Sequence, residues 1–397
     1  PCRHMAPAPV HTATAGGDDG PGSPQSPMSP MSPSTRRRSS MRGFVLAMMV
    51  VDPEDPGPAF YQLREEDGNP EPRLGELEVI MEYSSVGPFD RQLVADDSAR
   101  RRPHGCGFDG VGLVSKSRVD TLPASTRIAF VFREPAKDCG TWRSKLIISP
   151  VRACICRVPL QLLPQEAAAA LIPSLAALTC LRHFDRTRGQ PGATVVVTGA
   201  VGSSGLAIVQ EAAHRGLQVV ALVRGAFRAG WLQKELGEIC KGRLSTVDVT
   251  QPHWERLAVG LCGIDGSGAQ GVIDTVGGEL LPFVAQHLLK KQGKIIRFGS
   301  LAGEPDAAAL AEACRTWQLE TITENISNIL AASDCTERLA EMLRRIELRE
   351  TRSVIWQSTT WRNAGGCLEP QPVWSKCPTL YDEDRVWEQR RVGRILL

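Results

Sequence analysis

The sequence has almost no net charge, because 46 Lys and Arg residues are balanced by 44 Asp and Glu residues to leave a formal charge of +2. Proteins that attract nucleic acid electrostatically carry a clearly basic surface or domain. We therefore expect no nucleic-acid partner.

Cysteines in a metal-binding arrangement are also missing. Of the 12 cysteines, only Cys154 and Cys156 are close neighbours, and no C-x-x-C motif occurs. A structural zinc site needs four ligands with short spacings between them. The sequence therefore predicts no metal site, and scattered thiols of this kind are typical of a reducing compartment such as the cytoplasm.

Hydrophobic runs long enough for a membrane span are lacking as well. A transmembrane helix needs about 20 predominantly apolar residues, whereas the run from Ala167 to Ala177 is shorter and contains Pro173. The 397 residues, 42% hydrophobic and 23% charged, have the composition of a soluble globular protein with room for two domains. We expect no membrane partner.

Residues 1–40 differ from the rest of the chain. They are rich in Pro, Ser, Gly and Ala, and include the near-repeat Ser26–Pro33 before Arg36–Arg38. A segment with so little apolar surface to bury cannot offset the entropy cost of ordering, so we predict a disordered extension. Two interpretations stay open: a solvated tail, or an organelle-targeting extension, because the segment is rich in Ser and Arg and poor in acids.

The middle of the chain divides into two patterns. Residues 41–163 contain short strand-like runs between Gly, Pro and Asp turns, which predicts an irregular β domain. From Pro164 onward, strand-like and helical stretches alternate over 164–330, and such alternation predicts an α/β domain with a parallel sheet and helices on both faces. The runs that carry these predictions are Arg42–Ala47, Glu76–Tyr83, Gly105–Val114, Arg127–Phe132 and Lys145–Ile148, followed by strands at Thr194–Val197, Leu217–Val223, Gly271–Val276 and Lys294–Phe298, with a helix at Ser204–Arg215.

The last part of the chain is less regular. Leu339–Arg349 has the pattern of an amphipathic helix. Residues 350–380 hold Gly, Pro, Cys and Trp without a clear period, and we interpret them as an irregular insertion. Val392–Leu397 predicts a final strand.

The most informative motif is a G-x-x-G-x-x-G pattern formed by Gly199, Gly202 and Gly205, directly after a strand and before a helix. In a dinucleotide-binding turn, the first glycine permits the tight turn, the second lets the backbone approach the pyrophosphate, and the third lets the helix pack close to the sheet. The helix N-terminus then offers N–H groups and the positive end of its dipole to the phosphates. The pattern predicts a dinucleotide site; the alternative is a glycine-rich turn without a nucleotide.

The choice of dinucleotide depends on the end of the next strand. Here Val219–Val223 runs into Arg224, with Arg228 close by and no acid in the turn. Arginine binds a phosphate with two parallel hydrogen bonds, so we predict NADP(H). The alternative is that both arginines are solvated surface charges.

Several separated segments, in the same chain order, resemble the zinc-independent medium-chain dehydrogenase/reductase superfamily, and in particular its quinone oxidoreductase and acrylyl-CoA reductase-like branch. The resemblance implies a GroES-like β domain, formed by 41–163 and completed by about 331–397, with a Rossmann domain at 164–330. The segments are Tyr83–Ser85, Asp109–Ser117, Ala176–Thr179, Ala193–Gly205, Trp231–Leu232, Gly271–Gly278, Gly293–Gly299 and Gly393–Leu396.

The resemblance also implies roles for individual residues and a homodimer. Gly199, Gly202, Ser203 and Ser204 would touch the pyrophosphate and Arg224 the adenosine phosphate, while Thr179, Val276, Gly299 and Ser300 would lie near the ribose or the nicotinamide.

The chain departs from this family at two places. Zinc-dependent members carry Gly-His-Glu where this sequence has Gly107–Asp109, so no zinc is implied. The family's substrate-pocket Asn is missing, because Gly87 and Pro88 occupy that region. The remaining candidates for stabilising charge on a substrate carbonyl are backbone N–H groups or the hydroxyls of Tyr83, Ser84 and Ser85, although Tyr83 is more typical of a packed strand aromatic.

Together these features predict an NADPH-dependent oxidoreductase that transfers hydride, without zinc, to a small-molecule quinone, enone or 2-enoyl-CoA. The alternative hypothesis is a catalytically weak NADPH-binding sensor or scaffold of the same fold.

Overall fold

The computed structural model describes residues 43–49, 60–66, 71–86, 107–134, 140–187, 193–262, 267–299, 302–358 and 394–396. The predicted extension 1–40, the positions Gly87, Pro88 and Ser300, and most of the predicted insertion 350–380 lie outside these residues. The described residues all belong to one unit, Arg42–Leu397.

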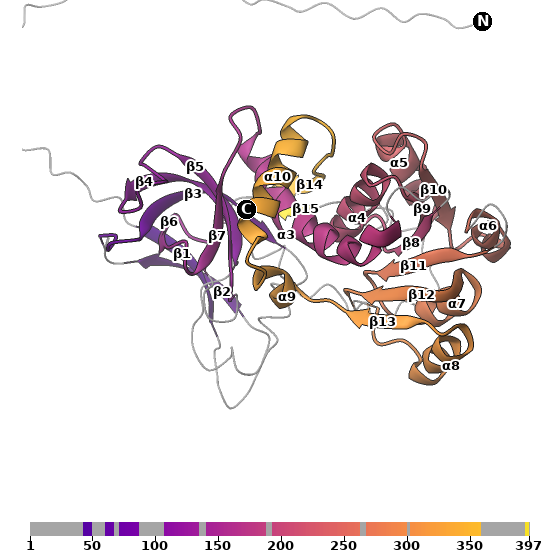
Figure 1. Ribbon diagram of the computed structural model, residues 1–397. Helices are drawn as coiled ribbons and strands as arrows, with labels where there is room; N and C mark the ends of the chain where they lie inside the picture. The colour runs from indigo at the N-terminus through magenta and orange to yellow at the C-terminus, as the bar shows by residue number, and fades with distance from the viewer. Residues whose placement is uncertain are drawn as a thin grey trace, which may run out of the picture. The chain divides into compact units, whose positions relative to one another are not determined.

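The first sheet is built largely from antiparallel strands and draws on both ends of the described chain (Figure 1). Its order is β14-β15-β3-β4-β5-β7, with β6 pairing with β3 as well. Because β15 runs antiparallel to β3, the final strand expected from the sequence joins the sheet of the N-terminal part. The bounds are β3 Leu77–Val86, β4 Asp109–Ser117, β5 Arg127–Phe132, β6 Lys145–Ile148, β7 Ala153–Arg157, β14 Ile355–Ser358 and β15 Arg394–Leu396, while β1 Gly43–Met49 and β2 Phe60–Glu66 form a separate antiparallel pair.

The second sheet is parallel, with strand order β10-β9-β8-β11-β12-β13. The order starts from β8 and runs outward in both directions, so the sheet is doubly wound, with its switch point between β8 and β11. This is the Rossmann arrangement that the alternating pattern predicted. The strands are β8 Thr194–Thr198, β9 Gln218–Val223, β10 Leu244–Asp248, β11 Ala269–Asp274, β12 Leu289–Arg297 and β13 Glu320–Thr323.

Helices cover both faces of this sheet (Figure 1). Val195 and Val197 of β8 belong to a core formed with α3, α4 and α5, whereas Val196 packs in a second core with α6, α7 and α8. A strand buried on both faces must be apolar at successive positions, which explains the uninterrupted valine run. The helices are α3 Pro164–Leu181, η1 (a 3₁₀ helix) Arg182–Thr187, α4 Ser203–His214, α5 Ala226–Leu236, α6 Trp254–Leu261, α7 Leu280–His287, α8 Ala307–Trp317, α9 Ile326–Leu330 and α10 Cys335–Glu347.

Helix α3 is longer than the apolar run from Ala167 to Ala177. It continues through Pro173 to Leu181, and by length and composition alone the segment Pro164–Asp185 could cross a membrane. However, 83% of its most apolar window is buried inside the protein. A helix buried to this extent is typical of the core of a folded domain.

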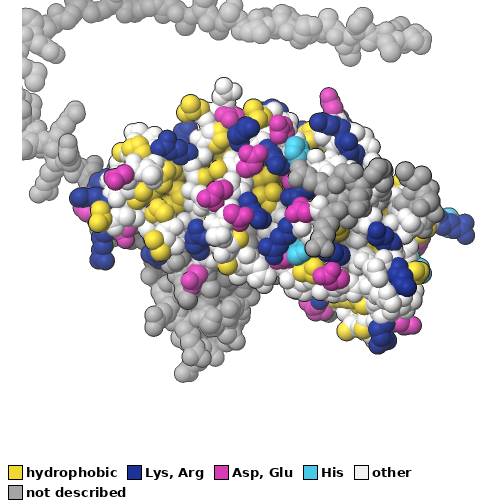
Figure 2. Space-filling view, in the orientation of Figure 1, with side chains coloured by type: hydrophobic (Ala, Val, Ile, Leu, Met, Phe, Trp, Pro, Cys, Tyr) yellow, Lys and Arg dark blue, Asp and Glu magenta, His cyan; other side chains and the backbone are white. Residues whose placement is uncertain are grey.

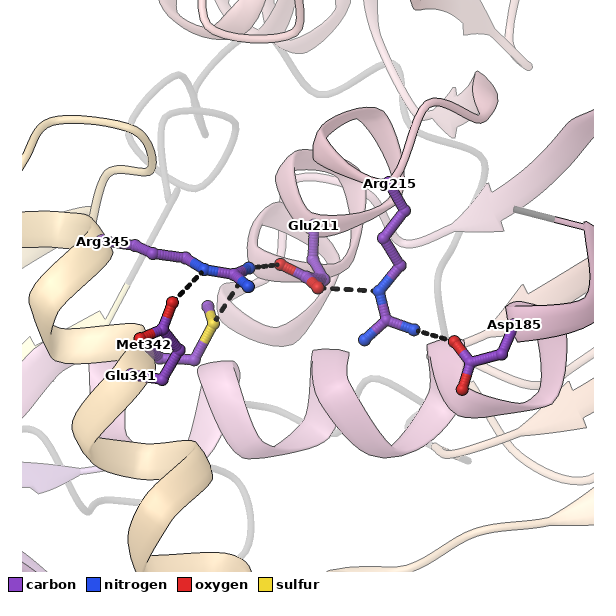
Figure 3. A network of polar contacts seen from close by, with 6 residues as sticks. All are labelled: Asp185, Glu211, Arg215, Glu341, Met342 and Arg345. Carbon is purple, nitrogen blue, oxygen red and sulfur yellow. Dashed lines mark hydrogen bonds and ion pairs between the residues drawn. The ribbon is translucent and has the colours of Figure 1, made fainter. Parts of the chain in front are cut away.

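Helix α4 is tied to α10 and to η1 by a chain of charged groups (Figure 3). The carboxylate of Glu211, only 1% exposed, accepts hydrogen bonds from Arg215 Nε and Arg345 Nη1, each at 2.7 Å. Arg215 also pairs with Asp185 at 2.9 Å, and Arg345 with Glu341 at 3.1 Å. The buried charge of α4 is therefore neutralised from both sides.

The visible surface carries side chains of both signs interspersed (Figure 2), as the small net charge leads one to expect.

Candidate cofactor site

The turn between β8 and α4 presents its backbone at the carboxyl edge of the parallel sheet. Gly199 has φ of +60°, a left-handed conformation that favours glycine, and its carbonyl oxygen accepts a 2.9 Å hydrogen bond from the N–H of Gly202. Gly202 is exposed and stands before the first residue of α4, and no side chain caps that helix. The positive end of α4 is thus open to an anionic group.

Glycines also allow three predicted site segments to meet. A Cβ atom on Gly199 would overlap the side chain of Val276, and one on Gly299 would overlap the carbonyl oxygen of Thr275. The Thr275 hydroxyl donates a 2.8 Å hydrogen bond to the carbonyl oxygen of Thr198 at the end of β8. The structure therefore places Gly199, Val276 and Gly299 side by side.

Within the described residues, no contact joins the other residues expected near the nicotinamide to this group. Thr179 is buried within α3, with 3% of its surface exposed. Ser300 lies outside the described residues. Their roles stay predictions.

Gly205 packs the first turn of α4 against the turn that precedes it. A Cβ atom there would overlap the carbonyl oxygen of Gly199 and would lie 2.8 Å from Cα of Ala200. Both obstacles are backbone atoms, which cannot rotate away. This is the close approach that the third glycine of the motif predicted.

We expect Gly205→Ala and Gly230→Ala to change stability in opposite directions. Gly205→Ala must displace the glycine turn, so it should destabilise the protein and weaken NADPH binding. Gly230, exposed within α5, has no atom within 4 Å of an added Cβ, so its replacement should stabilise the protein by about 0.5–1 kcal/mol through helix propensity. Urea unfolding of both variants checks this, and equal shifts of the same sign would refute the packing role of Gly205.

Near the end of β9, the two predicted arginines lie close to a carboxylate that was not predicted from the sequence. Arg224 is exposed and Arg228 is half-buried one turn into α5. Asp248, at the end of the neighbouring strand β10, accepts hydrogen bonds from Gly225 N at 2.7 Å and from Thr250 N at 3.0 Å. Parallel strands bring their carboxyl ends to one edge, so this acid, 24 positions along the chain from Arg224, faces the same turn.

Asp248 is engaged in shaping that turn. Burial acts to raise its pKa, but hydrogen bonds from Thr250, Gly225 and Gln251 together lower the pKa below its ordinary value. A carboxylate committed in this way supports the turn, in which Gly225 has φ of +95°. Arg224, in contrast, extends an exposed side chain from the same turn.

A second buried carboxylate, also missed, orders the turn after β11. Asp274 is fully buried, and its Oδ1 accepts from Thr198 Oγ1 at 2.5 Å and from Gly277 N at 3.1 Å. The available signal was an acid that ends a buried strand and precedes Gly277-Gly278, a combination typical of a side chain that accepts from its own turn. Asp274 thereby fixes the position of Val276.

Comparison with known proteins gives relatives in both sequence and structure. No family model matches the sequence. Rat quinone oxidoreductase-like protein 2 is 29% identical over 238 residues, which are 58% of this chain and 63% of the relative. The chain thus matches less than two thirds of that relative's length.

Among solved structures, a mycobacterial protein in complex with NADPH aligns over 89% of this chain and 99% of its own, with a TM-score of 0.64 and 20% identity. A 2-haloacrylate reductase aligns over 89% of this chain and 98% of its own, with a TM-score of 0.66 and 16% identity. The similarity in sequence and the similarity in fold both point to oxidoreductase-like proteins. The chain therefore has the fold of these solved structures and resembles quinone oxidoreductase-like proteins in sequence.

The hydroxyls proposed for catalysis have structural contacts. Ser84 and Ser85 are fully buried. Ser84 Oγ lies 2.7 Å from the carbonyl oxygen of Asp109 and 2.6 Å from Thr141 Oγ1, and Ser85 Oγ donates to the carboxylate of Asp109. Tyr83 is half-buried against the core of the first sheet. These contacts hold β3 to β4, and a catalytic role for the three residues stays a prediction.

The residues that stand where zinc-dependent members of the resembled family carry Gly-His-Glu also have structural contacts. Phe108 is 1% exposed in the core, and Asp109 is fully buried against Ser85. Within the described ranges, no three His, Cys, Asp or Glu side chains are grouped to hold a metal ion.

A cluster of charged groups lies at the same carboxyl edge, beside β13. Glu324 is 3% exposed, and its backbone N–H donates to the carbonyl oxygen of Arg297 at 2.8 Å. Its Oε1 lies 2.7 Å from Arg182 Nη2 and 2.6 Å from His183 Nε2, both at the start of η1. Burial acts to raise the pKa of Glu324, but the bonds from His183 and Arg182 outweigh it, and the pKa is lowered from its ordinary value of 4.5.

This cluster should make the protein less stable in acid. A carboxyl with a lowered folded-state pKa contributes stability that is present above its unfolded pKa and is lost as pH falls through the folded pKa. Glu324→Gln should therefore lose less stability than the wild type when pH is lowered below the ordinary Glu value of 4.5. Urea midpoints across the acid range test this, with Glu320→Gln, whose side chain is 57% exposed, as the control; parallel pH curves for wild type and Glu324→Gln would contradict it.

Proposed function

We propose that this protein is an NADPH-dependent reductase that transfers hydride, without zinc, to a quinone or to the activated double bond of an enone or a 2-enoyl-CoA. The observation that carries the proposal is the open glycine turn at the N-terminus of α4, with Arg224 exposed at the end of the neighbouring strand. The names of similar proteins, which include quinone oxidoreductase-like protein 2 and 2-haloacrylate reductase, support the reaction class.

The residues present fit the cofactor. At Gly202 an added Cβ would lie 3.2 Å from the carbonyl oxygen of Gly199, so the surface there is bare backbone that can approach a pyrophosphate. The first-turn N–H groups of Ser203 and Ser204 would donate to the phosphates, and the guanidinium of Arg224 would bind the 2′-phosphate.

NADPH, when bound, supplies the hydride. The chain's own contribution is to position it: Val276 and Gly299 border the turn beside Gly199, and Asp274 holds Val276 in place. Where negative charge develops on a substrate carbonyl, fixed N–H or O–H donors would stabilise it.

A second candidate function is a catalytically weak NADPH-binding sensor or scaffold. The contacts of Ser84 and Ser85 favour it, because both hydroxyls are already committed to Asp109 or Thr141. A protein of this kind would bind NADPH with the same turn and arginine but would not oxidise it.

Two measurements on the full chain separate these candidates. Thermal shifts with NADPH and NADH measure binding, since a ligand of the folded state alone raises Tm with its concentration. Consumption of NADPH with 1,4-benzoquinone, 9,10-phenanthrenequinone or crotonyl-CoA then measures turnover. Binding with turnover supports the reductase, binding without turnover supports the sensor, and binding of neither dinucleotide refutes both.

A further inference from the structure

A small cavity lies where α3, α4, α10 and residues 351–354 meet. Its volume is about 30 Å³, roughly the volume of one water molecule in the liquid and far below the ~150 Å³ of a cavity that admits benzene. Pro173, Leu206 and Ile346 form apolar parts of its wall, and Ser174 and Ser203 also line it. The cavity therefore has room for one water molecule, or two at most.

Two buried hydroxyl groups on the wall have no protein partner. Thr351 is 4% exposed, and within the described part of the chain neither Thr351 Oγ1 nor Ser353 Oγ makes a hydrogen bond. Both residues line the cavity, whereas the side chain of Arg352, between them, is 53% exposed and pairs with Glu235 at 2.7 Å.

The side-chain amide of Gln210, which also lines the cavity, already has hydrogen-bond partners. Gln210 donates from Nε2 to the carbonyl oxygens of Leu206, at 3.1 Å, and Arg352, at 3.0 Å, and its Oε1 accepts from the N–H of Arg352 at 2.7 Å. Both N–H donors of this side chain are occupied. Gln210 thus anchors the segment to α4 and leaves the two hydroxyls to find another partner.

We propose that this cavity is a binding site for an ordered water molecule, held by Thr351 Oγ1 and Ser353 Oγ, that joins the segment 351–354 to the first turn of α4. Part of the wall is apolar, but a cavity of this size that offers a water molecule two or more polar partners can hold it, whereas a purely apolar one stays dry. Water can donate to one hydroxyl and accept from the other, and the hydroxyls of Ser174 and Ser203 on the same wall can complete its bonds.

The site has a consequence for cofactor binding, and this part rests on the proposed function. Ser203 is the first residue of α4, whose open end is the proposed pyrophosphate site. The segment 351–354 continues directly into β14 of the first sheet. The bound water would therefore hold the N-terminal end of α4, the proposed pyrophosphate site, at a fixed distance from β14.

The test depends on the sign of a stability change. Val has the shape of Thr without the hydroxyl, so Thr351→Val removes one bond to the water, and we expect Tm to fall by about 2 °C. Ser353→Ala should act in the same direction, and the double variant should lose less than the sum, because both hydroxyls hold the same molecule. The exposed Thr121→Val serves as control. Without a bound water, Thr351→Val would remove an unpaired buried hydroxyl, and Tm would rise.

Two further readouts complete the experiment. Magnetic relaxation dispersion of water oxygen counts long-lived internal waters, and Thr351→Val should hold one fewer than wild type. NADPH should bind about threefold more weakly to Thr351→Val than to Thr121→Val. A rise in Tm or an unchanged water count overturns the water site whatever NADPH does, whereas a wild-type protein that binds no NADPH defeats the proposed function alone.

Discussion

Glu211→Gln is expected to lower the free energy of unfolding by about 3 kcal/mol, because removing one member of a buried ion pair leaves uncompensated charge in the interior. Glu211 is 1% exposed, and its two partners are nearly buried as well, with the side chains of Arg215 and Arg345 exposed by 11% and 17%. Gln keeps the shape of the side chain but not its charge. Arg345 then faces a neutral amide across the α4–α10 contact drawn in Figure 3, and Arg215 faces the same amide from the C-terminal end of α4.

A matched control comes from the same network. Glu341 pairs with the same Arg345, but half of its side chain is exposed, and exposed pairs contribute about 0–1 kcal/mol. Glu341→Gln should therefore change stability little. Urea unfolding of both variants measures the difference, and similar small losses would show that the buried carboxylate is dispensable.

Arg224→Glu is expected to invert the preference for NADPH over NADH. The arginine extends from the turn after β9, where a 2′-phosphate would lie, and hydrogen bonds between charged groups contribute about 1.5–3 kcal/mol. Their loss, together with repulsion from the new carboxylate, should weaken NADPH binding about 100-fold or more. A carboxylate there can also accept hydrogen bonds from the ribose hydroxyls of NADH, so NADH binding should be kept or improved.

The control for this experiment carries the same charge change at the opposite edge of the sheet. Lys241 is exposed just before β10 begins, so Lys241→Glu changes the net charge without touching the turn. Isothermal titration of both dinucleotides against both variants gives the two affinity ratios. If Arg224→Glu leaves the ratio at its wild-type value, the assignment of Arg224 to the 2′-phosphate is lost.

Short-range patterns in the sequence predicted most of the strands. The valine run of β8 and the glycines after it marked a parallel strand and an open helix N-terminus, because burial on both faces and a close backbone approach each demand particular residue types. The amphipathic pattern of Leu339–Arg349 matches α10, Cys335–Glu347. Strands β2, β7, β10, β13 and β14 were not predicted, because short runs carry little periodic signal.

The residues around the candidate site divide in the same way. Gly199, Gly202 and Gly205 could be named from the sequence, since one local turn imposes all three requirements. Asp248, Asp274 and Glu324 could not, because each accepts hydrogen bonds from groups on segments distant in the chain. A side chain whose partner comes from another strand has no spacing by which to recognise it.

What the sequence determined by itself was therefore the parallel sheet, the glycine turn and the arginines beside it, all of which follow from contacts between near neighbours in the chain. Only the tertiary structure decided that Ser84 and Ser85 are held by Asp109, and that β15 joins β3. It also placed the hydroxyls of Thr351 and Ser353 on a cavity with α4. Those outcomes depend on which distant segments pack together, and that is set by the burial of whole faces and the pairing of buried polar groups.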